Sequence, residues 1–244
     1  MIEPTKPIIR RGRDVGSGNF RAFGLEFGNF MEVLEQDTLF IESFKPIIGK
    51  SLVTKVKFAN LYLLISKWLP QLGTGDIIEF GSYKGGCAVF MALIASSLGL
   101  PIHVYGLDTF SGIPSSDKDI DYHKLGDFSN TSIGLAQNLA EELNIKNITF
   151  ISGLFEDTAK ETLLDCKPIL LAHIDCDIES AVRFSYDAVK DFMVSDGGYI
   201  VFDDPLHGSC LGAFQVIEDC VVRRDGLSAE QVYPHLVYRY PRLL

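Results

Sequence analysis

The sequence predicts an α/β fold in which a mostly parallel sheet is covered by helices on both faces. After about residue 70, short β-rich apolar runs alternate with stretches whose apolar residues recur at helical spacing. Such alternation is typical of parallel strands joined by right-handed helical crossovers. Each run is short, bounded by turn residues and rich in β-branched side chains, which favours strands over helices. The predicted strands are Asp76–Phe80, Ile102–Leu107, Ile148–Ser152, Ile169–Ile174 and Gly198–Phe202.

Near the C-terminus the alternation stops. Gln231–Tyr233 and Leu236–Tyr240 are two strand-like runs with no helix between them, so we expect an antiparallel hairpin that completes a seven-stranded sheet. The longest predicted loop is Thr109–Asn130, which is rich in Ser, Asp and Gly. Loops of that length inside a compact domain are often functional.

The chain before residue 70 has a different pattern, and we divide the sequence into an N-terminal arm with a helical region (1–70) and a Rossmann-like domain (71–244). Ser51–Leu69 reads as a helix with Ser51 as its N-cap, ended by Pro70 and Gly73. Residues 23–47 predict shorter helices. These segments precede the first strand of the sheet, so they are candidates for a substrate lid or a dimer surface.

Composition restricts the partners and the location. The chain of 244 residues is 47% hydrophobic with a net charge of −10, which argues against nucleic acid as a partner because phosphate binding needs clustered Lys and Arg. One basic cluster, Arg10, Arg11 and Arg13, is either a solvated tail or an arm over an anionic ligand. No apolar run predicts a signal peptide or a membrane span. We therefore expect a cytoplasmic protein.

The cysteines fit the same location. Five cysteines are scattered along the chain without a C-x-x-C spacing, a pattern of reduced thiols that predicts neither a disulfide framework nor a zinc site.

A glycine-rich turn, Glu79–Gly86, follows the first predicted strand. It lacks the G-x-G-x-x-G spacing of dinucleotide sites and the G-K-[ST] of phosphate-binding loops. An acid two residues before the first glycine is instead typical of sites for S-adenosylmethionine, where Glu79 would face the cationic amino-acid end of the cofactor. The alternative is an ordinary turn from strand to helix.

The next two strands add to this interpretation. Asp108 follows the second run, where a carboxylate at the edge of an α/β sheet can accept both ribose hydroxyls; the alternative is an aspartate that caps a turn. After the third strand, Leu154 and Phe155 could wall the adenine, with Phe155 stacked on the base or part of the core. The predicted cofactor residues are Glu79, Gly81, Ser82, Tyr83, Gly85, Gly86, Asp108, Thr109, Phe110, Gly153, Leu154, Phe155 and Asp175.

Four acids follow the last two parallel strands: Asp175 and Asp177 after the fourth, and Asp203 and Asp204 after the fifth. Neighbouring strand ends lie about 5 Å apart, so these carboxylates would repel one another and raise one another's pKa values. A hard divalent cation relieves the repulsion, and Mg²⁺ prefers a few carboxylates with positions left for water or substrate. We predict Mg²⁺ at Asp175, Asp203 and Asp204. The alternative, in which the acids cap loops and helices, applies best to Asp177.

The predicted chemistry needs such a cation. A hydroxyl becomes a good nucleophile when its pKa falls, and each unit is worth about 1.4 kcal/mol. A metal would also orient two substrate oxygens for in-line attack on a sulfonium methyl group. Asp177 is the first candidate for the general base and His207 the second, with Asp175 as the third catalytic candidate. His173 lies within a strand and is expected in the core.

At this point the sequence resembles the macrocin and mycinamicin type of sugar O-methyltransferase, a group of class I methyltransferases. The resemblance runs from about Leu61 to Ala213. It implies a class I fold, S-adenosylmethionine, Mg²⁺ on the three acids and Asp177 as the base. It also implies a homo-oligomer whose N-terminal helices shape the acceptor site. The matching blocks are Ala59–Tyr62, Glu79–Gly86, Leu107–Pro114, Gly153–Thr158, Ile174–Ile178 and Gly197–Asp204.

Two departures leave the acceptor open. Glu179 stands where the family usually has Tyr, and Leu154 stands where it usually has Trp. The predicted function is metal-dependent methylation of a small molecule with vicinal oxygens, such as a natural-product sugar. The alternatives are a catechol-type phenol as acceptor and a non-catalytic protein that binds S-adenosylmethionine. A nicotinamide-dependent oxidoreductase is disfavoured because the G-x-G-x-x-G turn is absent.

Overall fold

A sheet with strand order β3-β2-β1-β4-β5-β7-β6 runs through the computed structural model, which describes residues 30–241. The basic cluster Arg10, Arg11 and Arg13 lies outside the described residues. Seven strands form the sheet in this part of the chain; the first five are parallel, and β7 pairs antiparallel with both β5 and β6. The strands are β1 (Asp76–Phe80), β2 (Val104–Asp108), β3 (Ile148–Ser152), β4 (Ile169–Ile174), β5 (Gly198–Phe202), β6 (Ala229–Gln231) and β7 (Leu236–Tyr240).

The predicted strands are confirmed, although β2 begins two residues later than expected and the first strand of the hairpin runs over Ala229–Gln231 instead of Gln231–Tyr233. β2 begins at Val104 because the amide of His103 donates to the side chain of Asp76 instead of to a strand partner (3.0 Å). The first strand of the hairpin ends at Gln231 instead of Tyr233. Here the Gln231 side chain donates to the carbonyl oxygen of Tyr233 (2.7 Å), which closes the turn early.

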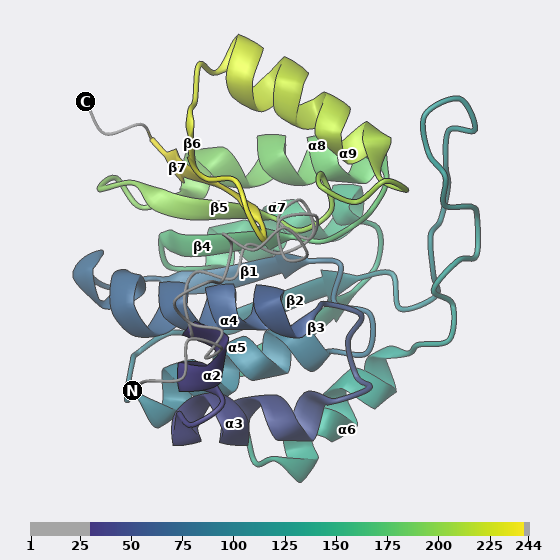
Figure 1. Cartoon of the computed structure of the whole chain (residues 1–244). Coiled ribbons are helices and arrows are strands. Elements are labelled where there is room, and N and C mark those ends of the chain that lie inside the picture. The colour runs from purple at the N-terminus through teal and green to yellow at the C-terminus, as the bar shows by residue number, and fades with distance from the viewer. Residues whose placement is uncertain (1–29, 242–244) are drawn as a thin grey trace, which may run out of the picture.

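Helices cover both faces of the sheet (Figure 1). One core lies under α3, α4, α5 and α6 and takes up strand side chains such as Ile77 and Val104. The other core lies under α7, α8 and α9 and takes up side chains of the same strands that point the other way, such as Ile78 and Leu107. Adjacent strand residues thus face opposite layers, and the strands are apolar on both sides, as buried parallel strands must be. The helices are α2 (Phe30–Leu34), α3 (Thr38–Phe44), α4 (Lys55–Leu63), α5 (Gly86–Ser97), α6 (Ile133–Glu142), α7 (Phe155–Asp165), α8 (Glu179–Val189) and α9 (Leu211–Val216).

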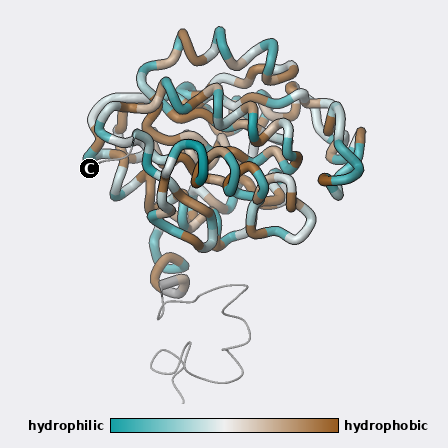
Figure 2. The backbone as a smooth tube through the Cα atoms, turned by 90° about the horizontal axis from the view of Figure 1, so that it is seen from above, coloured by the Kyte–Doolittle hydropathy of each residue, from teal (hydrophilic) through white to brown (hydrophobic). Residues whose placement is uncertain are grey.

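Several helices, such as α8, are amphipathic, whereas α5 is buried around most of its circumference. Along them hydrophobic and hydrophilic residues alternate in Figure 2. A helix with one apolar stripe must bury that stripe against the sheet, so this pattern explains why the helices lie flat on the two faces.

The predicted helix Ser51–Leu69 is shorter and less regular than expected. α4 begins at Lys55 after the N-cap Thr54, and a π-helical segment, Leu64–Trp68, continues it. Ser51 is not the N-cap: its hydroxyl accepts a hydrogen bond from the amide of Val53 (3.1 Å), which forms a local turn before the helix. Residues of this size and polarity favour such turns over helix interiors.

Two features place the functional site. Because β1, β2, β4 and β5 are parallel, the acids at their carboxyl ends meet at one edge of the sheet. The predicted loop Thr109–Asn130 carries no helix or strand and extends past this edge, in teal in Figure 1. Across residues 30–241, none of the helices combines the length and the apolar character that crossing a bilayer requires.

Candidate active site

A cavity of about 650 Å³ opens at the carboxyl edge of the sheet, within the size range of sites for small ligands. Residues from both predicted halves of the site line this one space. From the predicted cofactor set these are Gly81, Ser82, Tyr83, Asp108, Thr109, Leu154, Phe155 and Asp175. The predicted metal and catalytic residues Asp175, Asp177, Asp203, Asp204 and His207 also line it.

The turn after β1 is held by backbone contacts. Gly81 has φ +93°, and a Cβ there would collide with the carbonyl oxygen of Asp175, so only glycine lets β1 and β4 approach this closely. Tyr83 has φ 50°, and its amide donates to Asp108 (2.7 Å). Gly85 and Gly86 do not line the cavity; Gly85 is the left-handed N-cap of α5, and the Gly86 amide donates to the Lys50 carbonyl.

Asp108 is bound by two backbone amides at the end of β2. It accepts hydrogen bonds from Tyr83 and from Phe110 (2.6 Å), while burial raises the pKa of its carboxyl group. Thr109 lines the cavity and donates to the carbonyl of Gly112 (2.7 Å). Phe110 does not line it, because its ring packs edge-on against Phe150 in the core.

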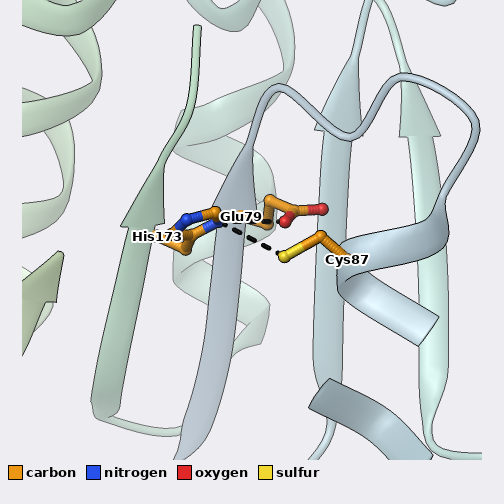
Figure 3. A group of neighbouring side chains, drawn as sticks. All are labelled: Glu79, Cys87 and His173. Atoms are coloured by element: carbon orange, nitrogen blue, oxygen red, sulfur yellow. Dashed lines mark hydrogen bonds and ion pairs between the residues drawn. The ribbon is translucent and has the colours of Figure 1, made fainter. Parts of the chain in front are cut away.

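Glu79 lies behind the cavity wall instead of in it. Its fully buried carboxylate accepts hydrogen bonds from the Ser82 hydroxyl (2.7 Å) and from His173 Nδ1 (3.0 Å). Figure 3 shows Glu79 and His173 directed toward one another from adjacent strands, with Cys87 of α5 beside them. In this structure Glu79 therefore reaches the cavity through Ser82, which does line it.

Leu154 and Phe155 form the wall after β3. The side chain of Leu154 is 42% exposed and lines the cavity. Phe155 also lines the cavity while its ring packs edge-on against Phe80 (centroids 5.3 Å apart), so it belongs to the core and reaches the cavity as well, and its stacking on adenine stays a prediction. Gly153, with φ 151°, shapes the turn without lining the cavity.

The acids after β4 and β5 form the predicted cluster. Asp175, Asp203 and Asp204 each offer one carboxylate oxygen, and these oxygens lie within 4.8 Å of one another. Burial and the neighbouring carboxylates raise the pKa values of Asp175 and Asp204 well above the usual range. This is the repulsion that the sequence predicted.

Asp203 differs from the other two because a lysine and a histidine side chain donate hydrogen bonds to its carboxylate. The Lys57 ammonium donates to both its carboxylate and its carbonyl oxygen, and His235 Nε2 donates to the other carboxylate oxygen (3.0 Å). His173 Nε2 lies 3.7 Å away, too far for a hydrogen bond. Burial opposes ionisation, yet these groups hold the pKa of Asp203 well below the usual range.

The pKa values of the two histidines around Asp203 shift in opposite directions. Burial lowers the pKa of His173, but the acids Asp203 and Glu79 outweigh it and raise the pKa to about 10, which favours the protonated ring. Burial dominates for His235 and lowers its pKa to about 4. The prediction that His173 lies in the core is confirmed, since none of its side chain is exposed.

The donor set fits Mg²⁺. All three carboxylates supply hard oxygen ligands, and among the described residues the ion pairs with Lys57, His173 and His235 all go to Asp203 and none to Asp175 or Asp204. Two carboxyl groups with raised pKa values therefore still lack a counter-charge, which a divalent cation can provide.

Asp177 and His207 line the part of the cavity beside the three acids, which we call the acceptor side. Asp177 has φ 62°, and its amide donates to Asp204 (2.8 Å). Its carboxylate, whose pKa is raised by burial, lies 3.6 Å from Nε2 of His123. It does not cap α8, whose N-cap is Ile178. His207 is exposed, and its Nδ1 is 2.6 Å from the Ser209 hydroxyl.

The sequence did not identify three polar residues of this site: Lys57, His123 and His235. His123 had a usable signal, because it lies in the loop already marked as functional. Lys57 lies two residues before the block Ala59–Tyr62, but nothing local distinguishes it from other lysines on a helix. His235 is joined to Asp203 across 32 residues, and no local pattern predicts that contact.

Comparisons with known proteins agree with this geometry. The family described as macrocin O-methyltransferase (TylF) matches residues 28–220. A tetracenomycin rhamnosyl 4'-O-methyltransferase from Streptomyces olivaceus is 22% identical over 69% of this chain and 67% of its own length. Mycinamicin III 3''-O-methyltransferase from Micromonospora griseorubida is 23% identical over 77% and 76%.

Solved structures give the same fold. The O-methyltransferase NovP superposes with a TM-score of 0.62 at 18% identity, covering 75% of this chain and 78% of that one. The predicted fold, a mostly parallel sheet that ends in an antiparallel hairpin, is confirmed.

Proposed function

The chain belongs to the macrocin O-methyltransferase (TylF) family and is an S-adenosylmethionine-dependent O-methyltransferase, and from this premise we propose that its acceptor is a natural-product sugar hydroxyl with a vicinal oxygen. We further propose that Mg²⁺ binds at Asp175, Asp203 and Asp204. One observation carries the proposal: the cofactor turn and the cluster of three acids open into the same cavity.

The ends of β1, β2 and β3 form the cofactor side of the cavity, and S-adenosylmethionine binds there. Gly81 and Ser82 bring the backbone close to the amino-acid end, and Glu79 fixes the Ser82 hydroxyl. Asp108 is positioned by two amides at the place where ribose hydroxyls bind in such sheets. Phe155 supplies an aromatic face or edge for the adenine.

The acceptor side holds the hydroxyl and receives its proton. When bound, Mg²⁺ would lower the pKa of a coordinated hydroxyl and hold two vicinal oxygens. Asp177, beside Asp204, takes the proton as the acceptor oxygen bonds to the methyl carbon and the carbon–sulfur bond breaks. His207 is the alternative base, because it lines the same cavity.

The sugar acceptor is supported by the two curated relatives, whose names specify methylation of a rhamnosyl group and of mycinamicin III. Glu179, at one of the departures from the family, does not reach the cavity: its carboxylate pairs with Arg183 (2.7 Å), and its amide donates to Asp121 of the long loop (2.9 Å). The other departure, Leu154, does line the cavity. Because Leu154 lies in the wall predicted for the adenine, this departure bears on the cofactor pocket and does not favour one acceptor over another.

Calorimetric titration of S-adenosylhomocysteine, with Mg²⁺ and then with EDTA, tests the site. Methyl transfer to a panel of nucleotide-linked sugars, glycosylated natural products and catechols, followed by mass spectrometry, tests the acceptor. We expect micromolar nucleoside binding and transfer to a sugar that EDTA abolishes. Transfer to catechols alone would replace the sugar proposal, and transfer insensitive to EDTA would refute the metal proposal. Nucleoside binding without transfer to any acceptor would favour a non-catalytic role.

A further inference from the structure

A second group of potential metal ligands lies beside the three carboxylates. His123, Asp177 and Cys210 come from three separate segments: the long loop after β2, the end of β4, and the turn before α9. All three line the cavity. We propose that these residues form a second metal site, which takes a borderline divalent cation of the Zn²⁺ class.

The distances support this assignment. One ligand atom from each residue lies within 4.8 Å of the other two. His123 Nε2 is 3.6 Å from the Asp177 carboxylate, and Cys210 Sγ is 3.5 Å from the same oxygen. In tetrahedral zinc sites, with bonds of about 2.0–2.3 Å, neighbouring ligand atoms are about 3.4–3.6 Å apart. The two distances to Asp177 therefore match the edge lengths of such a site, and the distance between His123 and Cys210 is at most 4.8 Å.

The donor types separate this site from the carboxylate cluster. Asp175, Asp203 and Asp204 offer hard oxygens, which suit Mg²⁺. A site with one imidazole, one carboxylate and one thiolate suits Zn²⁺ or Co²⁺ and excludes Mg²⁺. The two sites touch, because the Asp177 amide donates to Asp204 (2.8 Å). Both cations can therefore be present together, each in its own ligand set.

Cys210 is positioned for this role. Its side chain is 1% exposed while its sulfur faces the cavity group. The Ser209 hydroxyl lies 3.2 Å from His123 Nε2 and 2.6 Å from His207 Nδ1. The fourth position is left to water or to an acceptor oxygen. A site with three protein ligands and one open position is the arrangement of accessible zinc centres.

An ion at this site has a definite effect. It ties the long loop, through His123, to the strand ends and engages the carboxylate of Asp177. The existence of the site does not depend on the proposed function, but its consequence for catalysis does. If Asp177 is the base, Zn²⁺ inhibits methyl transfer while leaving nucleoside binding intact.

Titration of Co²⁺ into the full chain, with saturating Mg²⁺ to fill the carboxylate cluster, tests the site. Four-coordinate Co²⁺ bound to a thiolate gives intense visible bands and a charge-transfer band in the near ultraviolet. We expect one equivalent with these bands. Cys210→Ser should lose the charge-transfer band, and His123→Gln should weaken Co²⁺ binding at least tenfold.

Cys176→Ser is the matched control, because Cys176 is the cysteine next to Asp177 and also lines the cavity. The band should persist in this variant, and S-adenosylhomocysteine binding should report the integrity of each fold. The inference is overturned if no thiolate band forms, or if the band survives Cys210→Ser or disappears in Cys176→Ser. Should Cys210→Ser fail to fold, His123→Gln decides alone: unchanged Co²⁺ affinity refutes the site. Absence of nucleoside binding with a normal band would instead refute the proposed function.

Discussion

The two sides of the cavity treat their acids in opposite ways. On the cofactor side, Asp108 accepts two backbone amides and Glu79 accepts Ser82 and His173. On the acceptor side, Asp175 and Asp204 face other carboxylates, which raise their pKa values. One side is completed by the protein's own donors, whereas the proposed Mg²⁺ would complete the other. We therefore expect that cofactor affinity and metal affinity can be changed separately.

The largest expected effect comes from removing a carboxylate on the acceptor side. Asp204→Asn should abolish detectable Mg²⁺ binding and slow methyl transfer at least a thousandfold, or about 4 kcal/mol. S-adenosylhomocysteine affinity should stay within about threefold, because Asp204 belongs to the other side. Calorimetry and steady-state kinetics measure both effects. The control is Asp157→Asn, because Asp157 is an exposed acid of α7. Equal losses of Mg²⁺ binding and methyl transfer in the two variants would contradict the assignment of Asp204 to the acceptor side.

Lys57→Met should have the next largest effect, on stability. Removing one partner of a buried ion pair leaves an unpaired charge, and we expect a loss of about 3 kcal/mol in metal-free protein. Urea unfolding measures the loss, and Lys57→Arg should recover part of it. The control is Lys55→Met, whose pair with Glu35 is exposed and should change stability by less than about 1 kcal/mol. Similar losses for both lysines would show that Asp203 does not depend on Lys57.

On the cofactor side, Asp108→Asn should weaken S-adenosylhomocysteine about thirtyfold. The change removes the charge from two hydrogen bonds to backbone amides and so costs about 2 kcal/mol. Mg²⁺ binding should be unchanged. Calorimetry of both ligands distinguishes the two sides, and a parallel loss of Mg²⁺ affinity would show that they are coupled.

The smallest expected effect is the pH dependence of stabilisation by Mg²⁺. The folded pKa values of Asp175 and Asp204 are raised, so their ionisation destabilises the metal-free fold as pH rises above their usual value of 3.8. Asp203, with its lowered pKa, has the opposite sign: its contribution is present above 3.8 and is lost as pH falls. Mg²⁺ competes with protons for the first two acids. It should therefore raise the unfolding midpoint by a few degrees at neutral pH and less in acid.

Thermal unfolding with Mg²⁺ and with EDTA, at about pH 8 and about pH 5, measures this difference. Asp204→Asn should reduce the difference between the Mg²⁺-induced shifts at the two pH values. An equal shift at both pH values would argue against metal binding at ionised carboxylates.

The sequence predicted elements whose signal is local. Five mostly apolar runs became strands, because both faces of the central parallel strands β1, β4 and β5 are buried. Acids placed directly after those runs could be assigned to one edge for the same reason. Helix boundaries were predicted less accurately. Ser51 forms a turn instead of an N-cap, because contacts with the rest of the fold decide which of the two a serine side chain forms.

Contacts between distant segments could not be predicted. Lys57 and Asp203 are separated by 146 residues, and only the packing of α4 beside the strand ends joins them. Glu79 was expected in the cavity, but the register that pairs it with His173 directs its carboxylate into the sheet interior. The basic arm, the predicted oligomer and the cytoplasmic location stay predictions.

Gly81 has a consequence for how such an enzyme can diversify. The turn that it begins rests against the carbonyl of Asp175, so the methyl donor and the acid cluster share one rigid junction. A side chain at position 81 would collide with the carbonyl oxygen of Asp175, so we expect substitutions there to disturb the proposed donor and acceptor positions together. New acceptor preferences should therefore arise from the long loop, where a change of shape leaves this junction intact.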